Sequence, residues 1–537
     1  MHIARVLGVP LIAALLAACT HAGSVGGAGN TLTVAQVEEP QSLNPLRLSG
    51  FVSGELNGLL FSYLTTYDTK GGLMPQVARE VPSLSNGGIS HDGLQVTYNL
   101  RHDVRWQDGA PLTARDVVFT YNAIVNPRND AISRFGYENI RSVEAIEPYT
   151  VRVSLKRPQA AIVPFFLGGD SNYPILPAHL LARYRRLDEA PFNTQPVGSG
   201  PYRVVEWQHG DHMTLDANPR YFLGKPGIGR IVIKFVPDAQ TITNELHTGE
   251  ADTEFFADVS HLGELQKIAG HHLVETPTTA FGSLILNTQD PILRDSTVRR
   301  ALALAIDRNA IARKILKGVA DPDSGMRGLF TWAYDPSVGN VPYDPGVAAD
   351  LLQRAGWRSG PEGVRMKDGK ALRLVLLSES GDASRNAIAT QIAAYAAKIG
   401  MRLSIREITP DLMNSPEGPF HQGRYQIAQL PIESTDDPGA SWLLGCNQFP
   451  PNGFNDMRYC DPRIQRLLDD GANTTDRNRR AHDYGEVQRL LLHGVPIIFL
   501  YQTTEVDVVP DWLANYRPSM YTGQFTFAYQ WARRPIK

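Results

Sequence analysis

Alternating apolar and polar residues mark several short strands along the chain. Residues 94–100 and 149–155 keep a two-residue alternation over the whole segment, and residues 31–37 alternate apart from the adjacent Val34 and Ala35; this is the period of a half-buried strand. Residues 230–236 contain a more continuous apolar run, which predicts a more deeply buried strand. Helical patterns separate these strands, so we expect mixed α/β structure throughout.

Helices are predicted where an aspartate precedes an apolar stripe and a glycine follows it. The segments 238–249, 295–318 and 344–356 all have this form. Aspartate is a favoured N-cap residue, and glycine readily takes the left-handed conformation that ends a helix. We therefore expect one helix in each segment, the second being the longest.

The clearest parallel unit lies at residues 372–408. A strand at 372–377 precedes an apolar helical stripe at 383–399, and residues 401–408 alternate as a second strand. Two strands joined through a helix by short loops form a βαβ crossover. The two strands are therefore predicted to be parallel neighbours.

Length and composition indicate a globular protein of several domains. The chain has 537 residues, too many for one hydrophobic core, and about three domains are expected. Apolar residues make up 42% and charged residues 20%. The net charge is −3, so no basic excess exists to bind the phosphates of a nucleic acid, and we expect no nucleic-acid partner.

The N-terminal segment predicts export. Residues 6–18 form an apolar run that is too short to span a bilayer but suits a signal peptide. Its end, residues 16–19, is similar to the bacterial lipobox, in which the cysteine is lipidated. We expect a signal peptide at 1–18, a lipid anchor on Cys19, a flexible tether at 19–30 and a place in the cell envelope outside the cytoplasm, whether periplasmic or on the cell surface. The alternative is an ordinary signal peptide with an incidental cysteine.

Two further cysteines, Cys446 and Cys460, allow more than one state. In an exported chain they can form a disulfide, worth about 3 kcal/mol for a loop of this size. Two buried, unpaired thiols are the alternative. A zinc site is disfavoured, since no CxxC pair or nearby histidine completes a ligand set.

No catalytic motif stands out in the sequence. A Gly-x-Ser-x-Gly elbow, a Walker loop and a Gly-x-Gly-x-x-Gly motif after a strand are all missing. His209 and His212 flank Gly210 and Asp211, which predicts a solvated hairpin turn in preference to a metal site. We therefore expect no enzyme, no cofactor and no metal.

Residues 98–121 carry the most specific motif, a strand, an Asp-Gly turn and a helix capped at Thr113. This motif and several others in the same order resemble the family 5 extracellular solute-binding proteins, the peptide- and nickel-type receptors of ABC importers. The further matching segments are residues 175–179, 196–202, 218–226, 249–252, 284–288, 298–301 and 305–307.

The resemblance implies an α/β fold of the periplasmic-binding-protein type, with two lobes that close like a clamshell and mixed sheets flanked by helices. A discontinuous first lobe is expected from residues 31–63, 198–281 and 505–537. An extra small domain is expected at 64–197 and the second lobe at 282–504. The resemblance further implies that the chain crosses between the lobes at 284–287 and 497–501.

The function implied is capture of di- or oligopeptides and their delivery to the permease subunits of an ABC importer by a monomer anchored to the membrane. A non-peptide ligand, such as a sugar, an opine-like compound or a metal chelate, is the alternative within the same class. A secreted hydrolase predicts a catalytic constellation that the sequence lacks, and a signalling or adhesion role is a third class.

The loop at 433–442 departs from the family at one position. Peptide-binding relatives place an aspartate four residues before the proline, where it pairs with the peptide amine; this chain has Ser434 there. Glu433 and Asp436 are the neighbouring carboxylates that can supply the charge. The resemblance also implies that Cys446 and Cys460 are paired, as in the dipeptide receptors.

Other candidate ligand contacts are less specific. Arg385 follows the strand at 372–377 and is placed to meet a ligand carboxylate. The remaining candidates are Glu55, Asn57, Tyr334, Trp442 and Tyr501.

Overall fold

The computed structural model describes residues 30–534, except 48–50, 130, 132–133, 135, 172, 323–324, 381–382, 410–411, 414, 416 and 451–452. The predicted signal peptide at 1–18, Cys19 and the tether up to residue 29 lie outside the described residues. In the described part of the chain, no helix is both long and apolar enough to cross a membrane.

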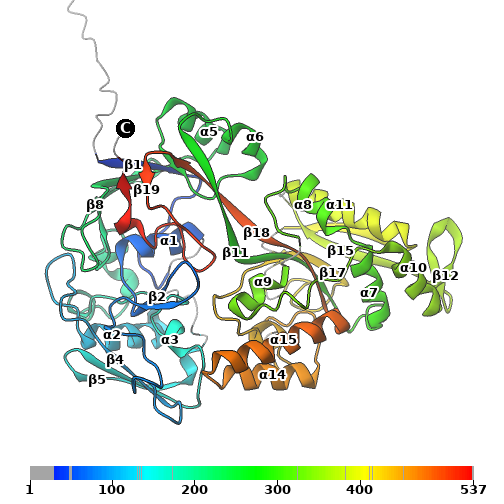
Figure 1. Cartoon of the computed structure of the whole chain (residues 1–537), viewed down its shortest axis with the longest axis horizontal. Helices are drawn as coiled ribbons and strands as arrows, with labels where there is room; N and C mark the ends of the chain where they lie inside the picture. Colours follow the sequence, from blue (N-terminus) through cyan, green and yellow to red (C-terminus); the bar gives the residue numbers. More distant parts are fainter. Residues whose placement is uncertain are drawn as a thin grey trace, which may run out of the picture.

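Two bodies are joined by a pair of long strands that run through both of them (Figure 1). These strands are central in a ten-stranded sheet. Its spatial order is β16 (Arg402–Ile408), β15 (Arg373–Glu379), β17 (Ile427–Ile432), β11 (His271–Leu286), β18 (Ile497–Pro510), β10 (Thr253–Glu254), β1 (Thr31–Gln36), β9 (Arg230–Phe235), β8 (His212–Ala217) and β7 (Tyr202–Gln208).

The two long strands, β11 and β18, pair antiparallel along almost their whole length, from His271 opposite Pro510 to Ile285 opposite Ile497. The register shifts between Pro277 and Phe281 and again between Gly282 and Ser283. These irregularities fall where the strands pass from one body to the other. The segment 284–287, predicted as one lobe crossing, lies just beyond this region, and the second register shift falls opposite residues 499 and 501, inside the other predicted crossing at 497–501.

The first body also contains a small sheet, in which β6 (Thr150–Leu155) lies between β4 (Gln95–Asn99) and β5 (Ile140–Glu147). Helix α2 (Ala114–Val125) contacts this sheet. As predicted, its cap is Thr113, whose N–H donates to the Asp116 carboxylate at 2.8 Å. One continuous hydrophobic core joins these elements to β1, β8 and β9.

The second body has a hydrophobic core on each face of the sheet. The βαβ unit is confirmed: β15 and β16 are parallel, and α11 (Ala383–Lys398) connects them. Helices α7 (Ser296–Ala305), α10 (Pro345–Arg354) and α11 cover one face. The other face is covered by α9 (Gly325–Phe330), α13 (Ser441–Leu444), α14 (Pro462–Ala472) and α15 (Arg477–Gly494).

The prediction of a single long helix at 295–318 is wrong. The segment forms α7 and a second helix, α8 (Arg308–Lys314). Ile306 is extended, with φ −92° and ψ 117°, and the Asp307 carboxylate accepts a hydrogen bond from the Ala310 N–H at 2.9 Å. Asp307 therefore acts as a second N-cap and interrupts a pattern that is apolar on both sides of it.

Other local predictions are confirmed. Helix α5 (Ala239–Thr248) is capped by Asp238 and ends at Gly249, whose φ is 78°. The Asp344 side chain caps α10. Gln208 pairs with His212, so the two histidines flank a hairpin turn, as expected. Cys446 and Cys460 form a disulfide.

The remaining elements are shorter and lie around these cores. They are α1 (Phe51–Leu60), β2 (Thr65–Tyr67), β3 (Leu73–Pro75), α3 (Ile162–Phe165), α4 (Ala178–Leu181), α6 (Leu262–Leu265), β12 (Arg358–Ser359), β13 (Arg365–Lys367), β14 (Lys370–Ala371), β19 (Leu513–Ala514) and β20 (Ala532–Arg533), with the 3₁₀ turns η5 (Val259–His261) and η6 (Thr331–Ala333).

Candidate functional site

A cavity of about 650 Å³ lies where the two bodies meet. The first body contributes Asp258 and η5, and the second contributes the first turn of α11. Strands β11, β17 and β18 form the wall between them. The cavity is therefore lined from both bodies and from the long strands that connect them. Figure 1 shows how strands β11, β17 and β18 lie relative to α11.

Two predicted ligand contacts, Arg385 and Tyr501, line this cavity together. The Arg385 side chain forms an ion pair with Glu379, and burial lowers the pKa of its guanidinium, an effect that nearby Tyr501 opposes. The Tyr501 ring packs over Gly282, where a Cβ atom would collide with the ring. Gly282 is therefore required for this placement of the ring on β11.

The amide of Gln429 is a third polar group in the cavity wall. Its Nε2 donates to the Arg385 carbonyl at 3.2 Å. Only 3% of the residue is exposed, and its Oε1 has no hydrogen-bond partner among the described residues. Because an unpaired buried acceptor is costly, Gln429 offers a place for a ligand donor.

Three carboxylates gather where β18 passes α1 and the C-terminal segment. Glu505 accepts a hydrogen bond from Gln524 Nε2 at 3.0 Å. Asp507 accepts one from the Tyr516 hydroxyl at 2.6 Å. The predicted candidate Glu55 lies against them and accepts hydrogen bonds from the backbone of the C-terminal segment. We call Glu55, Glu505 and Asp507 the acidic cluster.

Burial dominates the electrostatics of the acidic cluster. It raises the pKa of Glu505 to about 8, of Glu55 to about 7 and of Asp507 to about 6. The charges of Glu55, Asp507 and Glu433 raise the pKa of Glu505 further, and the charge of Asp507 also raises that of Glu55. In the part of the chain that the structure describes, no Lys or Arg side chain forms an ion pair with any of the three. A cationic group would therefore be stabilised here.

A second group of carboxylates, Asp170, Asp436 and Asp437, lies at another place where the two bodies meet. Asp437 is held by Arg480 through two hydrogen bonds, at 2.6 and 2.8 Å. Asp170 of the first body accepts a hydrogen bond from the Tyr67 hydroxyl at 3.0 Å. Burial, followed by the charges of Asp170 and Asp437, raises the pKa of Asp436 well above its usual range. The structure thus places Asp436 with this second group and not with the acidic cluster.

The other residues of the 433–442 loop are placed separately. Glu433 is exposed and close enough to Glu505 to raise its pKa. The Ser434 carbonyl accepts a hydrogen bond from Thr279 Oγ1 at 2.7 Å. Trp442 lines a neighbouring cavity of about 310 Å³.

Two predicted contacts lie outside the cavity walls. Asn57 is 2% exposed and is hydrogen-bonded to the hydroxyl of Tyr63. The ring of Tyr334 lies 5.5 Å from the Arg327 guanidinium and packs on the core of the second body.

Glu505, Asp507 and Gln429 were missed at the sequence level. A signal for the first two exists, because the carboxylates sit two residues apart, separated by Val506 and followed by Val508 and Val509, in a strand that is otherwise largely apolar. Side chains two apart share one face of a strand, so the pair marks a polar patch on a buried sheet. Gln429 carries a similar signal, since it is the one polar residue in the sequence of β17, but its unpaired oxygen is revealed only by the packing.

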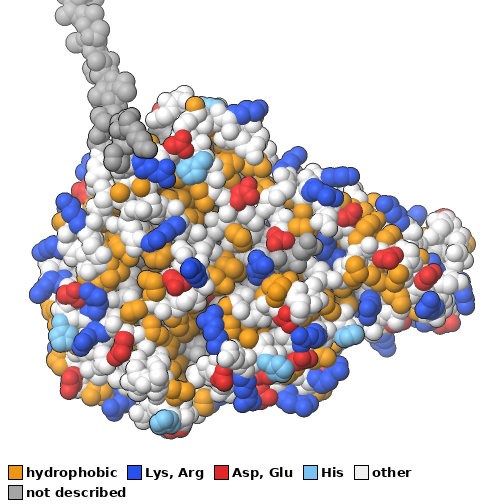
Figure 2. Space-filling model, in the orientation of Figure 1, with side chains coloured by type: hydrophobic (Ala, Val, Ile, Leu, Met, Phe, Trp, Pro, Cys, Tyr) orange, Lys and Arg blue, Asp and Glu red, His pale blue; other side chains and the backbone are white. Residues whose placement is uncertain are grey.

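Arg385 and Gln429 line the cavity, whereas the acidic cluster lies beside it, further along β18. Among the described residues, no group of three or more His, Cys, Asp and Glu side chains is arranged to hold a metal ion. On the visible face of the molecule, positive and negative side chains are interspersed (Figure 2).

Comparison with known proteins places the chain in a family. The family model for bacterial extracellular solute-binding proteins, family 5 middle, matches residues 73–447. The chain belongs to this family. The α/β fold with a large mixed sheet flanked by helices is the fold of its solved relatives, as predicted.

Similar proteins include receptors with different stated ligands. Protein XP55 of Streptomyces lividans is 29% identical over 485 residues, which cover 90% of this chain and 85% of the relative. The oligopeptide-binding protein AppA of Bacillus subtilis is 26% identical over 500 residues, covering 91% and 89%. The structure of NikZ from Campylobacter jejuni in complex with Ni(L-His) has a TM-score of 0.75 and 28% identity, covering 94% of this chain and 99% of NikZ.

Proposed function

We propose that this family 5 protein is the extracytoplasmic peptide receptor of an ABC importer and catalyses no reaction. The observation that supports a peptide most directly is the pairing of opposite charges in the region between the bodies. Arg385 lies in the cavity wall, and the acidic cluster lies further along β18. A free peptide carries a carboxylate at one end and an ammonium at the other, so it complements both.

The spacing of these groups fits a short peptide. Tyr501, beside Arg385, and Glu505 are four residues apart on β18. A strand rises about 3.3 Å per residue, so roughly 13 Å separates the two positions. An extended peptide of about four residues spans this length. We therefore expect tetrapeptides and close neighbours in length to bind best.

The edge of β17 offers a backbone partner for such a peptide. Its pairing with β15 stops at Gln429, whereas its pairing with β11 continues to Ile432. Among the described residues, no strand pairs with the β15 side of residues 430–432. An extended ligand can add to this free edge as a strand. Pro431 supplies only an acceptor, since it has no N–H.

Closure of the two bodies follows from the position of the ligand. A peptide that contacts α11 and the acidic cluster touches both bodies at once. It therefore binds the closed form better than the open form and shifts the population toward closure. We propose that the register shifts in β11 between Pro277 and Ser283 are the hinge. The lobe boundaries at 63/64, 197/198, 281/282 and 504/505 belong to this proposal.

The closed form would then be recognised by the permease subunits. We further propose that Cys19 carries the lipid anchor and that the receptor acts as a monomer at the membrane surface. A signal peptide at 1–18 would direct the chain there.

A cationic metal chelate is the second candidate ligand. Unpaired carboxylates suit a cationic complex as well as an ammonium, and NikZ is a relative solved with Ni(L-His). A sugar or an opine-like ligand has no such specific support. Ser434, in place of the aspartate of peptide receptors, leaves the acidic cluster as the proposed amine partner.

Calorimetric titration with tetra-alanine tests the proposal. The wild-type protein should bind it, and both N-acetylation and C-amidation should weaken binding at least tenfold, because each removes one charge. In Arg385→Gln, amidation should have little further effect. Arg373→Gln, an exposed arginine of the neighbouring β15, is the matched control and should behave as wild type. Equal affinity for free and blocked peptides would contradict the proposal.

A further inference from the structure

The second cavity, of about 310 Å³, adjoins the ligand cleft. Leu430 and Pro431 line both cavities, so the end of β17 separates them. This is the segment whose free edge is proposed to pair with a bound peptide. The second cavity is therefore within reach of a ligand side chain, and not of the ligand backbone alone.

Apolar and aromatic side chains form the walls of this cavity. Its inner surface includes Phe420, Leu443 and Met457, which are 6%, 3% and 0% exposed. Trp442 and Phe454 meet edge to face, with ring centroids 6.0 Å apart and an interplanar angle of 77°. Phe454 is 57% exposed, so its ring is left open to an incoming group.

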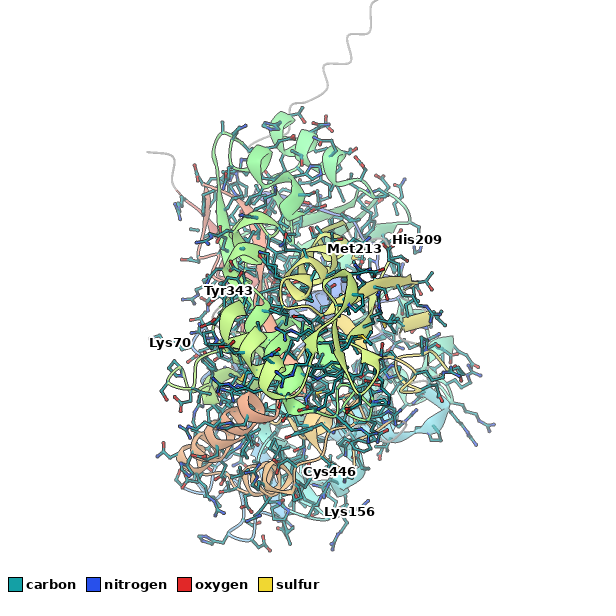
Figure 3. All side chains as sticks on the ribbon, turned by 90° about the vertical axis from the view of Figure 1, so that its right-hand side faces the viewer. Lys70, Lys156, His209, Met213, Tyr343 and Cys446 are labelled. Atoms are coloured by element: carbon teal, nitrogen blue, oxygen red, sulfur yellow. A yellow bond between two sulfur atoms is a disulfide. The ribbon has the colours of Figure 1, made fainter. Side chains whose placement is uncertain are left out.

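A disulfide and two hydrogen bonds anchor described residues of the segment that presents Phe454. The disulfide between Cys446 and Cys460 closes it (Figure 3 labels Cys446). Within it, the Asn455 amide donates to the Gly445 and Tyr459 carbonyls at 2.9 and 2.8 Å. A wall that is held in place before binding costs little entropy when a ligand arrives.

We propose that this cavity is a specificity subsite for an aromatic side chain of the bound peptide, an inference that rests on the proposed peptide-receptor function. Side chains of an extended peptide alternate between its two faces, so one of them meets this side of β17 while its neighbours face the larger cavity. A cavity of about 150 Å³ holds benzene, so this one has room for a phenyl or indole ring.

Edge-to-face contacts with Trp442 and Phe454 favour an aromatic over an aliphatic side chain. The ion pair of His421 with Asp456, at 2.9 Å, adds a polar group to the same wall. The hydrogen bond with the Asp456 carboxylate raises the pKa of the His421 imidazole. The wall therefore also accommodates the hydroxyl of a tyrosine.

Titration calorimetry with tetra-alanine and the four peptides that carry one phenylalanine in its place tests the subsite. In the wild-type protein, phenylalanine at one position should tighten binding about tenfold or more, as expected for burial of a phenyl group. Trp442→Ala should bring the affinity ratio of that peptide to tetra-alanine to within about threefold of unity. Phe454→Ala, at an exposed position, should reduce the ratio without risk to the fold. Trp512→Ala, remote in the first body, is the control and should keep the full ratio.

The outcomes distinguish a failure of the proposed aromatic subsite from a failure of the proposed peptide-receptor function. If all five peptides bind the wild-type protein equally, the subsite is wrong and the peptide receptor stands. If Trp442→Ala and Phe454→Ala weaken all peptides alike and leave the ratio unchanged, the cavity does not read the side chain. If no peptide binds the wild-type protein, the proposed function fails and the subsite fails with it.

Discussion

Replacing Glu505 with glutamine tests the electrostatic account of the cleft. Glutamine keeps the shape of the side chain and an oxygen that can accept the hydrogen bond from Gln524 Nε2. It removes only the charge. In the fold the pKa of Glu505 lies at about 8, raised by burial, Glu55, Asp507 and Glu433, against an ordinary value of 4.5.

The sign of the effect follows from where the proton is held. Between pH 4.5 and 8 the folded state binds more protons at Glu505 than the unfolded state does. The contribution of protonated Glu505 to the free energy of unfolding is therefore complete below pH 4.5 and is lost as the pH rises toward 8. At 1.36 kcal/mol per pKa unit the loss is at most about 5 kcal/mol. Water in the cleft and proton sharing with Glu55 reduce the measured loss to about 1–3 kcal/mol.

Urea denaturation of the ligand-free protein between pH 5 and 8.5 measures this loss. Wild type should lose more stability than Glu505→Gln over this interval, and the variant should be the more stable protein at pH 8.5. Glu275→Gln changes an exposed glutamate on β11 and should follow wild type at every pH. If Glu505→Gln is less stable than wild type at pH 8.5, the carboxylate is stabilised in the fold and the reasoning is wrong.

Three further changes have defined outcomes. Asp437→Asn leaves the buried Arg480 guanidinium without its ionic partner and should cost about 3–5 kcal/mol in urea denaturation; an unchanged midpoint would contradict a buried pair. Reduction of the Cys446–Cys460 disulfide should lower the free energy of unfolding by about 3 kcal/mol, measured by denaturation with and without reductant, and equal curves would show that the bond does not constrain the loop. Binding of tetra-alanine near pH 7 should release protons, because its ammonium favours the ionised form of Glu505. Calorimetry in buffers of different ionisation enthalpy detects this release, and proton uptake would argue against an amine at the acidic cluster.

Local elements were predictable where one residue decides them. Asp238 and Asp344 cap helices because a side-chain oxygen beside a free N–H acts within one turn. The same chemistry at Asp307 broke a helix that the apolar stripe predicted as continuous, since a strong hydrophobic pattern on both sides concealed the cap. Capping and periodicity then favour different structures, and the packing decides between them.

The site was predictable only in part. Arg385 follows a predicted strand and Tyr501 is one of the aromatic candidates, and the structure brings the two into one cavity. Glu433 and Asp436 were alternatives for the charge beside the ligand amine, and the structure places Asp436 beside Asp170 and Asp437. Glu505 and Glu55 are 450 residues apart in the chain, and their meeting depends on the path of β18 past α1. Such long-range contacts leave no local pattern.

Native mass spectrometry of the soluble form, residues 20–537, purified without dialysis, tests the central claim most directly. A receptor with Arg385 in the cavity wall and the acidic cluster further along β18 should retain peptides during purification. The account predicts a ladder of adduct masses near those of tetrapeptides, lost together on mild unfolding. A single adduct of non-peptide mass, or one that carries a metal isotope pattern, would contradict the peptide receptor and favour the chelate.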